Sequence, residues 1–155
     1  MSRRKIVRRE GDIVRVPLKD GRYSFARVLP GALFAFYSGV DRSQNAPPPA
    51  DIVKRPIAFI INVMAHAITE GRWVTVTNIP LADAMRRSPE FFKQDPLTGR
   101  LEKTRTGGGD EVPATREECR SLERAAVWEP EHVEERILDE FEGRTNRWVE
   151  QLRLK

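Results

Sequence analysis

Hydrophobic and polar residues alternate near the start of the chain, from Gly11 to Leu29 (GDIVRVPLKDGRYSFARVL). Val14, Val16 and Leu18 share one face of a first extended run, and a second alternating run begins at Tyr23. The Asp-Gly pair between the runs suits a tight turn, because both residues tolerate a positive φ. The pattern predicts an antiparallel hairpin, and because one hairpin is only marginally stable in water, other segments must cover its apolar face.

Three later segments extend the predicted sheet. Residues 32–37 (ALFAFY) predict a third strand with aromatic side chains on one face. Residues 57–63 (IAFIINV) are the most continuous apolar segment, and they predict a strand in the middle of the sheet, buried on both faces. Residues 72–77 (RWVTVT) alternate cleanly and predict its partner strand. Between the segments 32–37 and 57–63, residues 38–50 contain three consecutive prolines and predict a surface loop.

The middle of the chain predicts short elements. Residues 81–87 are expected to form one or two helical turns. Residues 90–93 and 100–103 flank Asp95–Gly99, where Pro and Gly suit a hairpin turn.

The spacing of apolar residues changes from a period of two to about 3.6 beyond Pro113. The preceding glycines 107–109 predict a flexible break. Residues 115–118 (TREE) have the form of a capping box, and a helix is expected from about 115 to 127, burying Cys119.

A second C-terminal helix is expected to begin at Pro130 and to end before Gly143. Its apolar stripe consists of Val133, Ile137, Leu138 and Phe141. Residues 146–154 fit a helix and a strand equally well.

These elements predict an α+β fold in which C-terminal helices cover a bent antiparallel sheet. The short opening strands suit an SH3-like partial barrel. The chain has 155 residues, 39% of them hydrophobic, which is the size of one ordinary domain. We therefore expect a single domain over residues 11–155, preceded by a basic flexible tail over residues 1–10.

The net charge of +4 is concentrated in that tail, which holds five basic residues and one acidic residue. The tail is either a solvated terminus or a weak, salt-sensitive attachment to phosphates. The remaining 145 residues are neutral in sum, so they give no electrostatic reason to expect DNA or RNA. No apolar run approaches the length of a membrane span, and Cys119 has no second cysteine to pair with. We expect a protein of the bacterial cytoplasm.

Groups suited to catalysis are scarce. His66 follows a predicted buried strand, His132 lies in the first turn of a helix between glutamates, and Cys119 falls on an apolar helix stripe. A hydrogen-bonded turn residue, an exposed side chain and a buried thiol are the ordinary interpretations of these three. One Cys and two distant His do not make a zinc site, and the glycines 107–109 lack the Lys-Ser/Thr of a phosphate loop. We expect no enzyme, and no catalytic, cofactor-binding or metal-binding residues.

The segment from residue 129 to 142 carries seven acidic residues and one arginine. It is either a solvated helix face or an acidic patch that attracts a basic partner and speeds their encounter. Aromatic residues are the usual anchors of such contacts. The candidate partner-binding residues are Glu131, Glu134, Glu135, Asp139, Tyr37 and Trp128.

The chain resembles the immunity protein 26 family from about Glu10 onward. The opening segment is similar to the family's N-terminal signature, with a Gly-Asp strand start, a Pro-Leu pair and then Gly-Arg-Tyr. Similar segments follow at Phe36-Tyr37, Gly71-Arg72-Trp73, Thr115 to Glu118, Glu131 to Glu134, and Phe141 to Arg144. The resemblance implies an immunity protein of a bacterial polymorphic toxin system, made by the producing cell to bind and neutralise a toxin domain. It implies no catalytic residues.

The sequence leaves two functions open. The first is stoichiometric occlusion of a cognate toxin domain, for which a phosphate-mimicking acidic helix would suit a nuclease. The second is an SH3-like-barrel nucleic-acid-binding module that uses the basic N-terminal tail, and it predicts oligonucleotide binding that falls steeply with salt.

Overall fold

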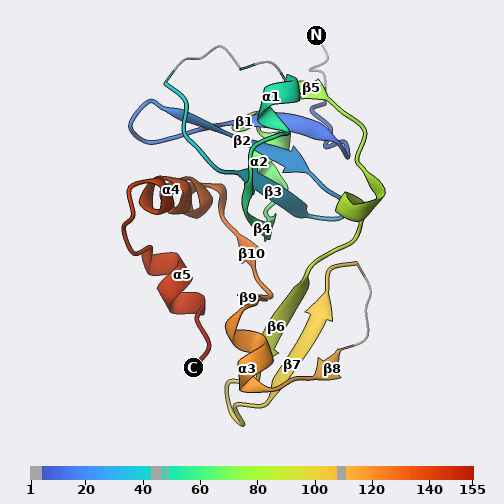
Figure 1. Ribbon diagram of the computed structural model, residues 1–155, viewed down its shortest axis with the longest axis vertical. Coiled ribbons are helices and arrows are strands. Elements are labelled where there is room, and N and C mark those ends of the chain that lie inside the picture. The colour runs from blue at the N-terminus through green and yellow to red at the C-terminus, as the bar shows by residue number, and fades with distance from the viewer. Residues whose placement is uncertain (1–4, 43–46, 48, 108–110) are drawn as a thin grey trace.

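The strands of this protein form two open sheets, seen in a computed structural model that describes residues 5–42, 47, 49–107 and 111–155 (Figure 1). The larger sheet has the order β10-β4-β3-β2-β1-β5 and the smaller one β8-β7-β6-β9. The strands of the larger sheet are β1 (Asp12–Pro17), β2 (Tyr23–Val28), β3 (Leu33–Tyr37), β4 (Ile57–Val63), β5 (Val74–Asn78) and β10 (Val127–Trp128). Those of the smaller sheet are β6 (Glu90–Gln94), β7 (Leu101–Arg105), β8 (Val112–Pro113) and β9 (Glu123–Arg124). The helices are α1 (Pro49–Ile52), α2 (His66–Thr69), the 3₁₀ helix η1 (Asp83–Arg86), α3 (Arg116–Arg120), α4 (Pro130–Phe141) and α5 (Arg147–Leu152).

The predicted α+β class is confirmed, with the strands divided between two sheets rather than gathered in one. Neither sheet closes into a barrel over the described residues. The smaller sheet lies at the opposite end of the molecule from β1, β2 and β5 (Figure 1).

The predicted hairpin at residues 11–29 is confirmed as β1 and β2, with Val14 opposite Ala26. Side chains alternate between two covered faces. Val14 and Val28 join the main core with Phe34, whereas Phe25 packs on the other face in a cluster with Ile52 of α1. The third strand is confirmed as β3 and is buried along its whole length.

The prediction that residues 57–63 form the middle strand is wrong, because β3 and β2 occupy the middle of the larger sheet. β4 pairs with β3 along its length, but β10 pairs with it only at Asn62 and Val63. Ile57 and Ala58 are consequently exposed at its beginning.

The predicted pairing of residues 72–77 with 57–63 is also wrong, because β5 pairs with β1 at the other edge of the sheet. Buried Arg27 holds the end of β5 there by donating to the carbonyl oxygens of Gly11 (2.9 Å) and Ile79. Gly11 has φ +88°, and a Cβ at this position would lie 2.5 Å from the Ile79 oxygen. Only glycine allows the two backbones to approach so closely. These tertiary contacts outweigh the closeness of β4 and β5 in sequence.

The expected turns at 81–87 and the hairpin at 90–103 are confirmed as η1 and as β6 with β7. Asp95 supports the hairpin turn, since its Oδ1 accepts from the amides of Leu97 (2.8 Å) and Thr98 (3.1 Å). The proline-rich loop and the glycine break lie partly outside the described residues. The described end of the proline-rich loop contains the beginning of α1, at Pro49.

The capping box at Thr115 is confirmed, but the helix that it starts ends at Arg120 rather than near 127. The chain then runs extended. β9 pairs in parallel with β6, the Ala125 amide donates to the Phe92 oxygen (2.8 Å), and β10 pairs in parallel with β4. Residues 123–128 thus connect the two sheets, and backbone pairing with both replaces the expected helical turns.

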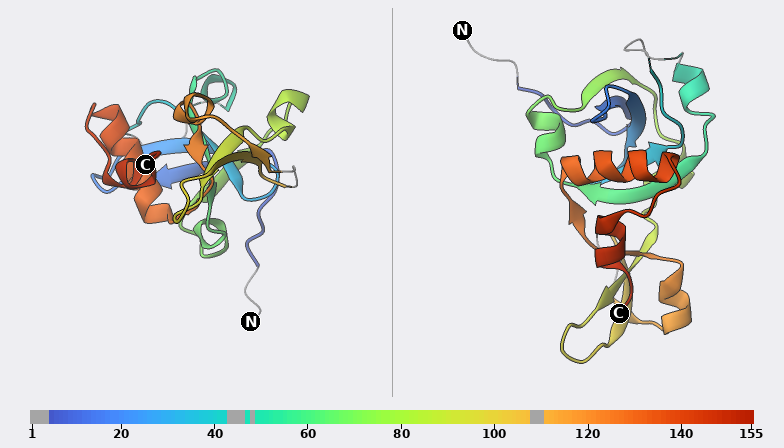
Figure 2. Two further views of the ribbon diagram at one scale, coloured as in Figure 1. Left: turned by 90° about the horizontal axis from the view of Figure 1, so that it is seen from below. Right: turned by 90° about the vertical axis from the view of Figure 1, so that its left-hand side faces the viewer.

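The helix from Pro130 is confirmed as α4, and Gly143 follows it with φ +72°. It runs across one face of the larger sheet (Figure 2) and buries Val133, Ile137 and Leu138 in the main core. Phe141 stays exposed. The segment at 146–154, open to two interpretations from sequence, forms helix α5.

Part of the expected solvated tail lies against the fold. Arg8 donates through Nη2 to the carbonyl oxygens of Leu29 (2.6 Å) and Leu33 (2.7 Å), and its guanidinium lies 5.1 Å from the centre of the Phe34 ring. Arg8 therefore contributes to the fold, while residues 1–4 lie outside the described part of the chain.

Candidate partner interface

The four carboxylates predicted as partner-binding residues line a single groove beside α4, with a volume of about 740 Å³. They are Glu131, Glu134, Glu135 and Asp139. The groove also carries four basic residues, Lys19, Arg72, Arg144 and Arg147. The expected acidic patch is therefore a groove of mixed and balanced charge.

Glu134 serves the fold. It is buried, and its two oxygens accept from Nε and Nη2 of Arg72, each at 2.7 Å. It also accepts from the indole N–H of fully buried Trp73 at 2.8 Å. Trp73 packs edge-on against Phe34 and Phe36, with ring centres 5.4 and 5.6 Å apart. Glu134 thus connects α4 to the aromatic centre of the core.

Glu135 and Asp139 connect α4 to α5. Glu135 accepts from the indole N–H of Trp148 and from Arg147 Nε (3.3 Å). Asp139 accepts from the side-chain amide of Asn146 (2.9 Å), which is the N-cap residue of α5. These two carboxylates are already engaged within the protein.

Glu131 is the most exposed of the four, with 76% of its side chain accessible. Its nearest basic group is Arg72 Nη1 at 3.9 Å. Of the predicted carboxylates it is therefore the one best placed to meet a partner.

The two aromatic candidates are buried. The Tyr37 hydroxyl accepts from Arg27 Nη1 (3.3 Å), and Trp128 lies in the main core with the Arg136 guanidinium 5.1 Å from its ring centre. Both side chains are over 95% inaccessible, so neither is available to a partner in this conformation.

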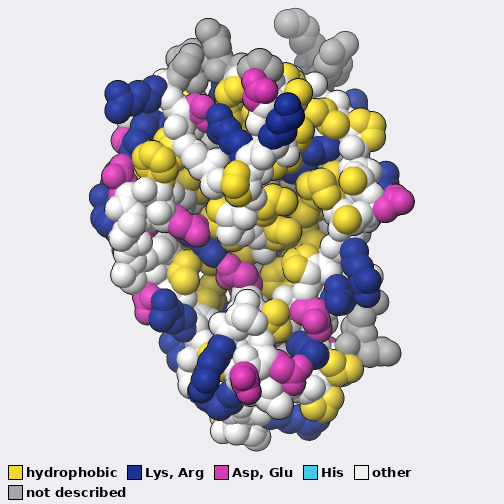
Figure 3. Space-filling view, in the orientation of Figure 1, with side chains coloured by type: hydrophobic (Ala, Val, Ile, Leu, Met, Phe, Trp, Pro, Cys, Tyr) yellow, Lys and Arg dark blue, Asp and Glu magenta, His cyan; other side chains and the backbone are white. Residues whose placement is uncertain are grey.

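A hollow at the beginning of β4 is an exposed apolar feature that sequence reasoning missed. Two cavities meet there, of about 440 and 500 Å³, and both are lined by Ile57 and Phe59. The first also touches Ile137 and Phe141 of α4, while the second touches Ile60. In Figure 3, hydrophobic side chains gather in a hollow between the upper and lower parts of the molecule. The run IAFIINV indicated burial on both faces, and nothing local in it signals that β10 covers only its end.

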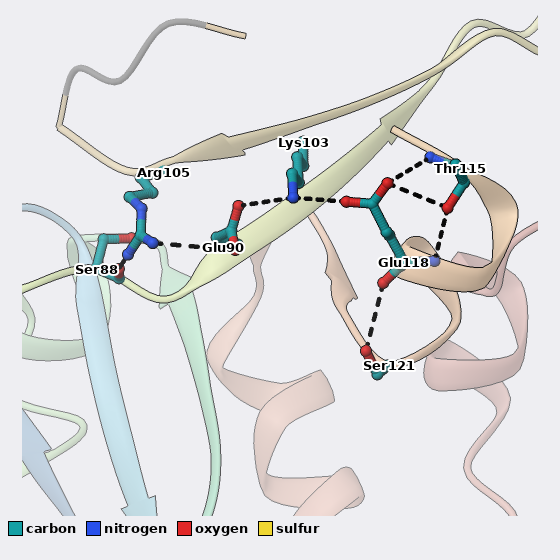
Figure 4. A network of polar contacts seen from close by, with 7 residues as sticks. All are labelled: Ser88, Glu90, Lys103, Arg105, Thr115, Glu118 and Ser121. Carbon is teal, nitrogen blue, oxygen red and sulfur yellow. Dashed lines mark hydrogen bonds and ion pairs between the residues drawn. The ribbon is translucent and has the colours of Figure 1, made fainter. Parts of the chain in front are cut away.

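The charged residues that line the two cavities are three acids, Glu90, Glu123 and Glu140, and one base, Arg105. A chain of polar contacts crosses the smaller sheet here (Figure 4). In it, Arg105 donates to the backbone carbonyl oxygen of Ser88 (2.6 Å). The Glu90 carboxylate lies 3.9 Å from the Arg105 guanidinium and 3.6 Å from the Lys103 ammonium group. These contacts hold Glu90 and Arg105 in place at the border of the hollow.

Glu140 is less well compensated than the other acids of the hollow. Arg136 forms its close ion pair with Glu123 and lies 3.9 Å from Glu140. Partial burial raises the pKa of Glu140, since desolvation disfavours its charged form more than Arg136 restores it. A basic group of a partner would find an incompletely paired carboxylate here.

The three residues considered for catalysis either contact neighbouring side chains or are buried. His66 begins α2 and lies 3.1 Å from Glu129, while His132 stacks on Trp148 with ring centres 3.5 Å apart. Cys119 is fully buried, and burial raises the pKa of its thiol. Within the described ranges, no three His, Cys, Asp or Glu side chains gather closely enough to hold a metal ion. None of the described helices has the length and apolar character needed to cross a membrane.

Comparison with known proteins gives one family. The family model described as Immunity protein 26 matches residues 9–102, which includes the larger sheet up to β5 and the β6–β7 hairpin as far as Glu102. No curated protein and no solved structure matches the chain. These comparisons lend no support to the nucleic-acid-binding alternative.

Proposed function

Because this chain belongs to the immunity protein 26 family, we propose that it binds and neutralises a cognate toxin domain in the cytoplasm of the bacterium that makes both. Neutralisation occurs by stoichiometric occlusion, in which the immunity protein covers the toxin's active site or its entry. Such a protein needs a stable interface and performs no turnover.

The observation that carries this proposal beyond family membership is the apolar hollow beside β4. Ile57 and Phe141 are 42% and 51% exposed, and charged residues line the same cavities. Exposed apolar cavities bordered by charged residues are typical of protein interfaces, where a few buried anchors supply most of the binding energy. The hollow offers room for such anchors from a partner.

The groove beside α4 has a second role in this proposal. Glu131 projects from it and would attract a basic toxin surface, such as the phosphate-binding face of a nuclease. Attraction of this kind acts mainly on the association rate and is weakened by salt. Glu134, Glu135 and Asp139 would shape the groove through their internal contacts rather than meet the toxin directly.

We expect the reading frame immediately upstream of the gene to encode a toxin domain. The experiment first sequences that reading frame and then uses the toxin domain it encodes. We expect growth arrest when this domain is induced alone, growth when both proteins are produced, and co-purification of the two as an equimolar complex. Absence of protection and of complex formation with the upstream toxin domain would overturn the proposal. Purified protein that instead bound oligonucleotides in a salt-sensitive manner would favour the nucleic-acid alternative.

A further inference from the structure

Among the residues that the structure describes, no strand lies beside the edge of β4 that faces away from β3 from Ile57 to Ile61. The pairing with β10 covers Asn62 and Val63 only, and the Met64 amide continues it by donating to the Trp128 oxygen (2.9 Å). Upstream of Val127 the chain leaves this edge to pair with β6. Within the described residues, five positions of β4 therefore present an open edge, about 16 Å long at roughly 3.3 Å per residue.

Alternation along the strand identifies the backbone groups that point outward. The Val63 amide donates inward to the Ala32 oxygen (3.0 Å), whereas the Met64 amide points outward to β10. Ile61 is paired with Phe34 of β3, in the same alternation as Val63. It follows that the N–H and C=O groups of Ile60 point to the open edge.

The two cavities of the hollow border core clusters on opposite faces of β4, since Phe59 belongs to the main core with Ile137, whereas Ile60 packs on a second cluster with Phe91. One is bounded by α4 through Ile137 and Phe141, and the other by the smaller sheet through Phe91. Ile57 and Phe59 line both. Successive side chains of an added strand point to opposite faces, so they would enter the two cavities in turn. Main-chain hydrogen bonds would then supply affinity, and the two cavities would supply selectivity, as in strand-addition complexes.

We propose that an extended segment of the toxin domain adds to the larger sheet as a strand along Ile57–Ile61, with alternate apolar side chains in the two cavities. This inference rests on the proposed function and specifies its interface. The segment carries a Lys or Arg beside Glu140, whose carboxylate is the incompletely paired acid of the hollow. That pairing is the charge complementarity that favours a basic apolar strand over an acidic one.

The other edge of the same sheet provides a matched contrast. Val74 at the start of β5 is 46% exposed, close to the 42% of Ile57, and β5 is a terminal strand of the larger sheet. None of the cavities described above is lined by Val74. A partner strand there would gain backbone bonds without side-chain pockets.

The first experiment compares Ile57→Asp with Val74→Asp, using the upstream toxin domain as the probe in calorimetric or surface-binding titrations. Each variant puts a charge at an exposed edge position, and circular dichroism with thermal unfolding checks that both stay folded. We expect Ile57→Asp to raise the Kd by at least about tenfold, as for an interface anchor, and Val74→Asp to change it by less than about twofold. Glu140→Gln should raise the Kd by a few fold, roughly the effect of one charged contact.

The second experiment separates strand addition from side-chain contact alone. Amide hydrogen exchange, followed by NMR, is compared for the free protein and the complex. We expect the Ile60 amide to exchange rapidly when free and to become strongly protected in the complex, while Ile61, already bonded to β3, changes little.

The outcomes distinguish this inference from the proposed function. If the unmodified protein neither binds the toxin domain nor protects growth, the proposed function fails first. If it binds and protects, but Ile57→Asp binds equally well or the Ile60 amide gains no protection, only strand addition is overturned. If sedimentation shows that the free protein is a dimer, and Ile57→Asp makes it a monomer, the occupant of the edge is a second copy of the chain and the inference is likewise overturned.

Discussion

Replacing Glu134 by Ala tests the conclusion that this residue serves the fold rather than a partner. Its removal leaves the indole N–H of buried Trp73 without an acceptor, which costs about 1–3 kcal/mol. It also removes the ion pair with Arg72, whose side chain is 40% exposed and so contributes only about 1 kcal/mol. Together these effects predict a loss of about 3 kcal/mol in the free energy of unfolding.

The measurement is urea denaturation, with Glu131→Ala as the control on the same helix. At a slope of about 2 kcal/mol per M, the Glu134→Ala midpoint should fall by about 1.5 M. Glu131→Ala should lie within about 0.5 kcal/mol of the unmodified protein, because the side chain of Glu131 is 76% exposed and its ion pair with Arg72 is 3.9 Å long. Glu134→Gln keeps an acceptor for Trp73 and should lose only about 1 kcal/mol. Equal midpoints for Glu134→Ala and Glu131→Ala would show that Glu134 does not stabilise the fold.

Three further predictions concern single groups. The pKa of Glu118 is lowered to about 2, chiefly by the hydrogen bond from Lys103, so its stabilising contribution is complete above pH 4.5 and is lost as the pH falls through about 2. NMR titration should give this midpoint, and Lys103→Met should move it upward; a midpoint that ignores Lys103 would contradict the assignment. Cys119, buried and with a raised pKa, should react with a thiol reagent only in urea, and rapid labelling of the native protein would count against its burial. Glu131→Lys should slow association with the upstream toxin domain by a few fold at low salt, an effect that shrinks at high salt, whereas an unchanged rate would remove the electrostatic role.

The sequence predicted well those elements whose determinants are local. The β1–β2 hairpin depends on alternating residues around Asp20-Gly21, and α4 depends on Pro130, an apolar stripe and Gly143. These signals act within a few residues of the structure that they specify, so the pattern and the structure agree.

Elements that depend on distant partners were predicted less well. Thr115 started a helix as expected, but the segment after Arg120 took its conformation from pairing with β6 and β4, which no local pattern records. β5 likewise paired with β1, beside Gly11, whose carbonyl oxygen accepts from Arg27 and whose lack of a Cβ lets the backbone after β5 approach closely. Tertiary hydrogen bonding overrides local propensity in both cases.

The same distinction explains the candidate site. Acidic residues of α4 could be identified from sequence, but their arginine and tryptophan partners come from the segment before β5 and from α5. The open edge of β4 could not be identified, because it results from where β10 stops pairing. A surface defined by missing coverage is a property of the assembled fold.

Neutralisation by stoichiometric occlusion can be measured by titrating the activity of the upstream toxin domain with this protein. Residual toxin activity should fall linearly and vanish at one equivalent, with the toxin recovered intact from the complex. Activity that persists at several equivalents, or toxin that is inactivated by far less than one equivalent, would contradict stoichiometric occlusion.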